Sequence, residues 1–100
     1  MNNKIYGFLG LAMRAGKLDT GEQRVRDRIK SGKALLVIIA EDASENTKKK
    51  ITDMCSYREI KLITLNDRYK LGECIGKEFA VVLSVSDKGF AKQILKLYEE

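Results

Sequence analysis

The chain has 100 residues, 44% of them hydrophobic and 33% charged, with a formal net charge of +5. This length and balance are typical of one folded domain and exclude an intrinsically disordered chain. The sequence contains no histidine, which excludes catalytic triads and most transition-metal sites built on that residue. No apolar run approaches the ~20 residues of a membrane span, and the N-terminus lacks the apolar block of a signal peptide. We therefore expect a cytoplasmic protein with a single domain, 1–100, and no membrane partner.

The first third of the chain alternates between helical and extended patterns. Apolar residues recur at helical spacing over residues 4–15, which predicts an amphipathic helix. Residues 17–20 are predicted to form a short edge strand or a turn. A second helix is predicted over 21–32, with Val25 and Ile29 as its buried pair. Because two apolar anchors are few, most of the surface of this helix must face water or a polar partner.

The rest of the chain continues the alternation. Residues 34–40 form a continuous apolar run rich in β-branched residues, the pattern of a central strand covered on both faces. The further predicted elements are a helix over 44–58 capped by Ser44, a strand over 61–65, a helix over 69–75, a strand over 79–86 and a helix from 87 onward. The order α-β-α-β-α-β-α-β-α predicts an α/β fold, with one four-stranded sheet and helices on both of its faces.

Helical spacing also predicts which side chains face the core. On the third helix the inner side is expected to carry Thr47, Ile51, Met54, Cys55 and Arg58, and on the last helix Phe90, Ala91, Ile94, Leu95 and Tyr98. The two cysteines, Cys55 and Cys74, are far apart in sequence and both fall on the apolar side of a predicted helix. We interpret them as small buried hydrophobic residues, and a redox pair is the alternative.

Nearly all of the net charge comes from one segment. Residues 14–33 hold seven of the 19 lysines and arginines and three of the 14 acidic residues, a net of +4, whereas the remainder has a net of +1. Lysine and arginine neutralise phosphates, and polar side chains near a helix start can reach base edges. We therefore interpret the second helix as a surface for an anionic partner, with RNA as the first candidate. A solvated helix face is the alternative, and the lysine run 48–50 fits a solvated face or an outer phosphate contact.

Two shorter segments carry candidate chemistry. In the loop 76–80, Phe79 follows a glycine and two charged residues, where its ring can stack on an unstacked base; alternatively, Phe79 is the first core residue of the next strand. Glu41 and Asp42 follow a strand and could form a metal or acid–base pair, but adjacent carboxylates there are more often loop or helix-capping charges. Neither a P-loop nor a dinucleotide-binding glycine motif occurs, and we expect no cofactor, no metal and no enzymatic activity.

Several segments, in their order and spacing, resemble a known family. The segments similar to the ribosomal protein L7Ae family, whose members bind kink-turn RNA, are Gly21, Ser31–Ala43, Leu71–Lys77 and Val82–Phe90. The segments similar to its bacterial branch, the YlxQ-type proteins, are Leu9–Gly16 and Ala40–Lys50. The resemblance covers almost the whole chain, and it implies a three-layer α/β/α sandwich with a small mixed sheet.

The resemblance also implies where RNA is bound. In the family, the start of the second helix enters the RNA at tandem sheared G·A pairs, and the loop before the last strand packs on bulged bases. The residues implied here are Gly21, Glu22, Gln23, Arg24, Asp27, Arg28 and Lys33 of the helix, and Lys77, Glu78, Phe79 and Ala80 of the loop. Two of them depart from the family pattern. Arg24 replaces an acceptor with a donor, and Asp27 places a carboxylate where a lysine is usual.

The function implied is that of a non-catalytic, monomeric RNA-binding domain that recognises a kinked, kink-turn-like structured RNA. Such a protein would be ribosome-associated or ribosomal-protein-like, with ribosomal RNA, the ribosome or another ribonucleoprotein as its partner. The alternative is a protein-interaction module of the same fold, in which Arg24 and Asp27 have weakened or altered RNA binding.

Overall fold

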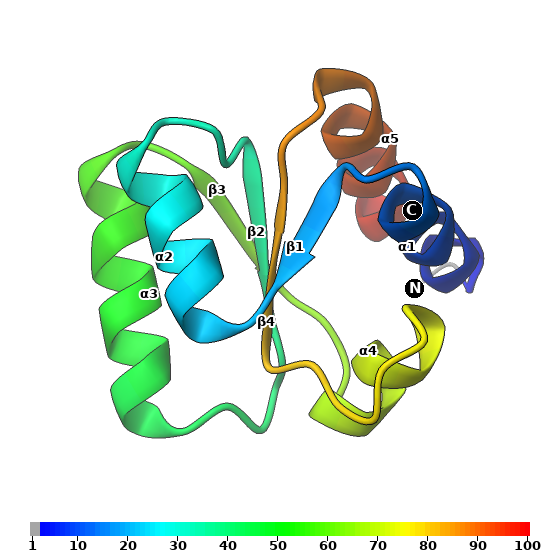
Figure 1. The fold of residues 1–100 in the computed structure, drawn as a ribbon, viewed down its shortest axis with the longest axis horizontal. Helices are drawn as coiled ribbons and strands as arrows, with labels where there is room; N and C mark the ends of the chain where they lie inside the picture. Colours follow the sequence, from blue (N-terminus) through cyan, green and yellow to red (C-terminus); the bar gives the residue numbers. More distant parts are fainter. Residues whose placement is uncertain (1–2) are drawn as a thin grey trace.

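The computed structural model describes residues 3–100, in which five helices alternate with four strands (Figure 1). The helices are α1 (Lys4–Arg14), α2 (Glu22–Lys30), α3 (Glu45–Tyr57), α4 (Arg68–Cys74) and α5 (Lys88–Glu99), and the strands are β1 (Leu18–Thr20), β2 (Leu36–Ile39), β3 (Lys61–Thr64) and β4 (Val82–Val85). The predicted element order is confirmed, and the short segment before α2 is a strand. No helix in this part of the chain has the length and apolar character needed to span a membrane.

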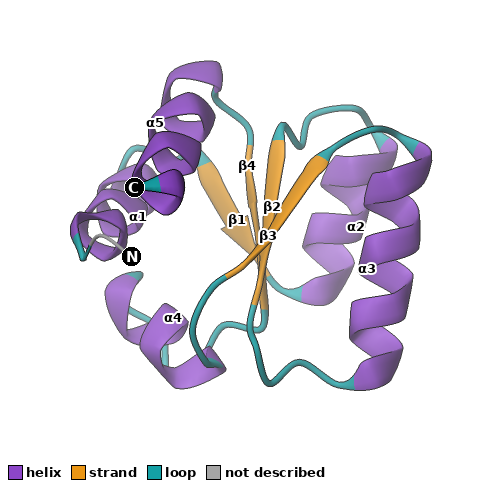
Figure 2. Ribbon diagram, turned by 180° about the vertical axis from the view of Figure 1, so that it is seen from behind, coloured by secondary structure: helices purple, strands orange, loops and turns teal. Residues whose placement is uncertain are grey.

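The strands form one mixed sheet in the order β1-β4-β2-β3 (Figure 2). β2 pairs with β3 in parallel, whereas β4 is antiparallel to both of its neighbours, β1 and β2. Because β4 is the last strand along the chain but lies next to β1, the start of α2 comes close to the segment that precedes β4. The amide of Gly21 donates to the carbonyl oxygen of Val82 at 3.3 Å, which joins these two segments.

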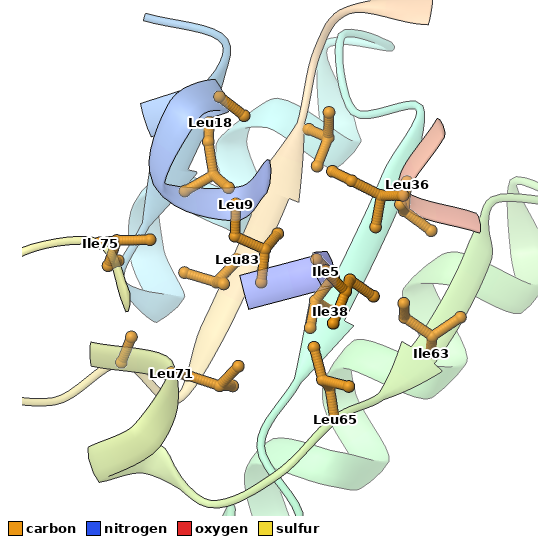
Figure 3. Close-up of a cluster of buried hydrophobic side chains, with 14 of the residues drawn as sticks. Ile5, Leu9, Leu18, Leu36, Ile38, Ile63, Leu65, Leu71, Ile75 and Leu83 are labelled. Atoms are coloured by element: carbon orange, nitrogen blue, oxygen red, sulfur yellow. The ribbon is translucent and has the colours of Figure 1, made fainter. Parts of the chain in front are cut away.

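Helices cover both faces of the sheet, with α1, α4 and α5 on one face and α2 and α3 on the other (Figures 1 and 2). Alternating residues of β2 point to opposite faces. Leu36 and Ile38 belong to the core cluster under α1, α4 and α5 (Figure 3), while Val37 and Ile39 belong to the cluster under α2 and α3. Because both faces are buried, this strand is an uninterrupted apolar run. The predicted three-layer α/β/α sandwich with a small mixed sheet is confirmed.

The last strand is shorter than predicted. The strand begins at Val82, and the carbonyl oxygen of Val81 still accepts from the amide of Ala40, next to β2, at 2.8 Å. The amide of Ala80 instead donates to the carbonyl oxygen of Arg68 in α4 at 2.9 Å, so Phe79 and Ala80 follow α4 and not the sheet. The prediction that the strand begins at Phe79 is therefore wrong.

Two helices differ from the predicted core pattern at single positions. Arg58 is exposed and does not lie on the inner side of α3, because the helix ends at Tyr57. Its guanidinium lies over the Tyr57 ring, with Cζ 5.3 Å from the ring centroid. On α5, Leu97 is buried together with Ala91 and Ile94, although the predicted set did not include it.

The two cysteines lie in different core layers. Cys55 is buried in the cluster under α2 and α3, whereas Cys74 is half-buried against the cluster on the other face of the sheet. Burial raises the pKa of each thiol to about 11. Both thiols are free and lie on opposite sides of the sheet, so the interpretation as small core residues is confirmed and a redox pair is excluded.

Candidate nucleic-acid interface

α2 is preceded by Gly21, whose backbone has φ 100° and ψ 135°, a conformation that other residues rarely adopt. Gly21 is the N-cap residue and has no side chain, so it does not supply the first backbone N–H groups of α2 with the acceptor that a serine or aspartate would provide. An added Cβ at Gly21 would have no neighbour within 4 Å, which places the residue on open surface. The start of α2 therefore presents backbone donors that a ligand can approach closely.

A surface hollow of about 410 Å³ opens beside this helix start, and we call it the interface hollow. It is bordered by the end of β1, the starts of α2, α3 and α4, and the segment before β4. The residues that line it are Thr20, Gly21, Glu22, Ser44, Thr47, Arg68, Lys77, Phe79, Ala80 and Val81. The structure thus brings together part of the predicted site, namely Gly21 and Glu22 from the helix with Lys77, Phe79 and Ala80 from the loop.

The loop 77–80 rests on α4. The amide of Lys77 donates to the carbonyl oxygen of Gly72 at 2.9 Å. The backbone of Phe79 is so close to Gly72 that an added Cβ there would lie 2.5 Å from the Phe79 Cα. The Phe79 side chain points away from the core and is 55% exposed, so Phe79 is not a core residue of the strand. The backbone contact with α4 leaves its ring available to a ligand.

Glu22 is held at the edge of the interface hollow by α3. The Thr47 hydroxyl donates to Glu22 Oε1 at 2.7 Å, and the Ser44 hydroxyl donates to Thr47 Oγ1 at 3.0 Å. Ser44 also accepts from the Thr47 amide at 3.1 Å, as its predicted capping role requires. The carboxylate of Glu22 therefore occupies a defined position and is not a mobile surface charge.

The other predicted helix residues lie along the outer side of α2. Arg24, Asp27 and Arg28, with Ser31, border a second hollow of about 290 Å³, which we call the outer hollow. Nε2 of Gln23 donates to Oδ1 of Asp27 at 3.1 Å. Three predicted residues, Gln23, Lys33 and Glu78, are exposed and line neither hollow.

Arg24 and Arg28 are both paired with one carboxylate. Nε of Arg24 donates to Oδ1 of Asp19 at 2.7 Å, and Nε of Arg28 donates to Oδ2 at 2.9 Å. Asp19 belongs to β1, and the predicted site did not include it. The basic side of α2 is therefore tied to the edge of the sheet.

Arg68 is the cation of the interface hollow that the sequence analysis missed. Its backbone amide and Nε donate to the Asp42 carboxylate at 3.0 and 3.1 Å, and Nη2 donates to the Asp42 carbonyl oxygen at 2.7 Å. Desolvation would raise the pKa of Asp42, but the hydrogen bonds and charge of Arg68 outweigh it and hold that pKa below its ordinary value. Asp42 thus positions Arg68 beside the hollow, which accounts for this carboxylate without a metal.

The fold and the two hollows define a small α/β/α domain in which a basic helix face adjoins an exposed aromatic loop. The profile of the ribosomal protein L7Ae/L30e/S12e/Gadd45 family matches residues 3–95. The chain belongs to this family, as the sequence motifs indicate.

Two relatives support this assignment over nearly the full length. The RNA-binding protein YlxQ of Bacillus subtilis is 44% identical over 94 residues, which are 94% of each chain. The RNA-binding protein YlxQ of Enterococcus faecium is 45% identical over 96 residues, covering 96% of this chain and 92% of the relative. The resemblance to the YlxQ-type branch is therefore confirmed.

Solved structures show the same fold. A Bacillus halodurans protein of unknown function superposes with a TM-score of 0.94 at 40% identity, covering 97% of this chain and 98% of that protein. The Giardia lamblia 15.5kD RNA binding protein superposes with a TM-score of 0.81 over 99% of this chain and 88% of its own. At 16% identity, the second likeness concerns the fold alone.

The contact between Gly72 and Phe79 generates a prediction. Replacing Gly72 with alanine should lower the free energy of unfolding by about 1–3 kcal/mol, because the new methyl group overlaps the Phe79 backbone. Urea denaturation followed by circular dichroism measures this change. The matched control is Gly7→Ala in α1, where an added Cβ has no neighbour within 4 Å; better helix propensity should raise its stability by up to ~1 kcal/mol. Equal stabilities for the two variants would contradict the contact.

Proposed function

We propose that this protein is a non-catalytic RNA-binding protein that recognises a kinked, structured RNA. The observation that supports the proposal most strongly is the interface hollow, where the open start of α2 meets the loop that carries Phe79. Backbone donors, an exposed ring and two cations, Lys77 and Arg68, border the same space. These are the groups that bind phosphates, base edges and unstacked bases.

A kinked RNA fits this arrangement better than a regular duplex. In A-form RNA the deep major groove is closed to side chains and the bases are stacked, so an exposed aromatic ring finds no free base to contact. At a kink or bulge, bases leave the stack and can lie on a ring such as Phe79. Gly21, fixed on β4, and Phe79, fixed on α4, border the same hollow, so an RNA that uses both must offer an unstacked base close to its backbone, as a kinked RNA does.

The basic side of α2 supplies the complementary charge. Arg24 and Arg28 lie along the helix beyond its start, where the backbone of an RNA bound at Gly21 can continue. Carboxylates also occupy this surface, but Glu22 accepts from Thr47 and Asp27 from Gln23. Because a carboxylate facing a phosphate is repulsive, we expect Glu22 to face bases or sugars that offer hydrogen-bond donors. Asp27 borders the outer hollow beside Arg24 and Arg28, where its charge reduces the attraction of that surface for phosphate.

The relatives support this proposal and suggest the first RNA to test. Two proteins about 44–45% identical to this chain are named RNA-binding proteins. The family is described as one of ribosomal proteins. We therefore propose that the partner belongs to the structured RNAs that contain kink-turn-like elements, with ribosomal RNA as the first case to examine.

Binding should depend on both the shape of the RNA and the salt concentration. In a fluorescence titration, a kink-turn RNA should bind at least tenfold more tightly than a straight duplex of equal length. If Arg24, Arg28, Arg68 and Lys77 each contact one phosphate, the plot of log K against log salt should have a slope of about −3. Equal affinity for the two RNAs would contradict shape recognition, and the absence of binding to either would contradict RNA binding.

Substitution of Asp27 distinguishes the proposed RNA-binding protein from a protein-interaction module that has lost RNA binding. With natural RNA binding present, Asp27→Lys should tighten binding to both RNAs by roughly tenfold, or about 1.4 kcal/mol, because it removes a repulsive charge and adds an attractive one. Asp53→Lys is the matched control: Asp53 is exposed on α3, pairs with Lys49 at 3.4 Å and lies outside both hollows. If kink-turn binding is absent in the natural protein and arises only with Asp27→Lys, the interaction module is the better description.

A further inference from the structure

The side chain of Asp19 connects the sheet to the basic face of α2. In the antiparallel pairing of β1 with β4, Asp19 lies opposite Ser84. Its side chain is only 14% exposed, and each of its two oxygens accepts from a different arginine of α2. The partners Arg24 and Arg28 are one helical turn apart and keep 64% and 30% of their side-chain surface exposed. One carboxylate therefore fixes two cations that remain open to a ligand.

The geometry of these bonds leaves the outer ends of both arginines unused. Each arginine donates through Nε, at 2.7 Å for Arg24 and 2.9 Å for Arg28. Within residues 3–100, neither arginine makes a hydrogen bond through its terminal nitrogens. A guanidinium held by Nε keeps a planar pair of donors on its far edge, and that edge matches a phosphate. The same two arginines border the outer hollow of about 290 Å³ together with Asp27 and Ser31. A phosphate can lie there against the two arginines, which outnumber the one carboxylate of the hollow.

We propose that Asp19 is a positioning residue for RNA recognition, which orients Arg24 and Arg28 toward successive phosphates beyond the interface hollow. This inference rests on the proposed RNA binding and adds a determinant of its shape selectivity. An arginine on an open helix face samples many rotamers and attracts any phosphate. Two arginines that share one carboxylate hold their donor groups in a fixed arrangement. Only an RNA whose successive phosphates have the matching spacing and direction can contact both.

The charge of Asp19 has a second effect that makes the idea testable. The carboxylate lowers the local positive charge by one, so it weakens attraction to any RNA while it improves the geometry for the right one. Removing the charge should therefore change the two kinds of binding in opposite directions. Unfolding or loosening of the domain would instead weaken both.

The experiment compares the natural protein, Asp19→Asn and Asp53→Asn in titrations with a kink-turn RNA and a straight duplex. Asp53→Asn makes the same charge change on α3, outside both hollows. For Asp19→Asn we expect the straight duplex to bind severalfold more tightly and the ratio of the two affinities to fall on the order of tenfold. For Asp53→Asn we expect the ratio to stay as in the natural protein. A thermal melt of each variant establishes that it is folded.

A second variant tests the same idea without changing Asp19. Arg24→Lys combined with Arg28→Lys keeps both charges but removes both Nε donors, so the affinity ratio should fall while straight-duplex binding stays about the same. In that background, Asp19→Asn should lower the ratio no further. If the natural protein and the Asp19→Asn variant both prefer the kink-turn RNA over the straight duplex by the same factor, Asp19 is not a positioning residue, and the proposed function still stands. If the natural protein binds the kink-turn RNA and the straight duplex equally well, both the proposed function and the role of Asp19 are wrong.

Discussion

The start of α2 stays open to a ligand because only two side chains of the helix hold it on the sheet. Val25 and Ile29 are its only buried residues, and they lie four positions apart on one side. Full burial of each is worth on the order of 1.5–3 kcal/mol, which is enough to seat a short helix while its other sides stay free. A wider apolar side would turn more of the helix toward the sheet and leave fewer polar groups for a partner. The small apolar side of α2 and its large polar surface therefore have the same cause, the small number of core residues in this helix.

The acidic residues of the basic surface fix the positions of the side chains around them. Asp19, Glu22, Asp27 and Asp42 each accept a hydrogen bond from a neighbouring side chain or backbone group, and each of these bonds includes a residue that borders a hollow. Positive charge alone attracts any phosphate, whereas fixed donor positions favour one shape of ligand. The chain therefore combines an excess of lysine and arginine with carboxylates that hold particular side chains in place. We regard this combination as the physical basis of the proposed shape selectivity.

Much of the fold could be predicted from local pattern. Within the apolar run 34–40, the strand β2 is buried on both faces and only Leu35 is exposed, and the buried pair Val25 and Ile29 follows directly from helical spacing. The site was predictable only in part, because its determinants are pairings between segments far apart in sequence. Glu22 with Thr47 and Asp42 with Arg68 join residues 25 and 26 positions apart, and no local pattern reports them. The late start of β4 has the same origin, because the Ala80 amide bonds to the Arg68 carbonyl oxygen and the Phe79 backbone packs against Gly72, both in α4.

In the proposed complex, RNA binds where the start of α2 meets the loop before β4. Amide chemical shifts recorded during titration with a kink-turn RNA test this location most directly, because each amide reports on its own surroundings. We expect the largest shift changes over residues 20–28 and 77–81, smaller ones at Ser44 and Thr47, and almost none along α5. Changes centred on α1 and α5, on the other face of the sheet, would contradict it.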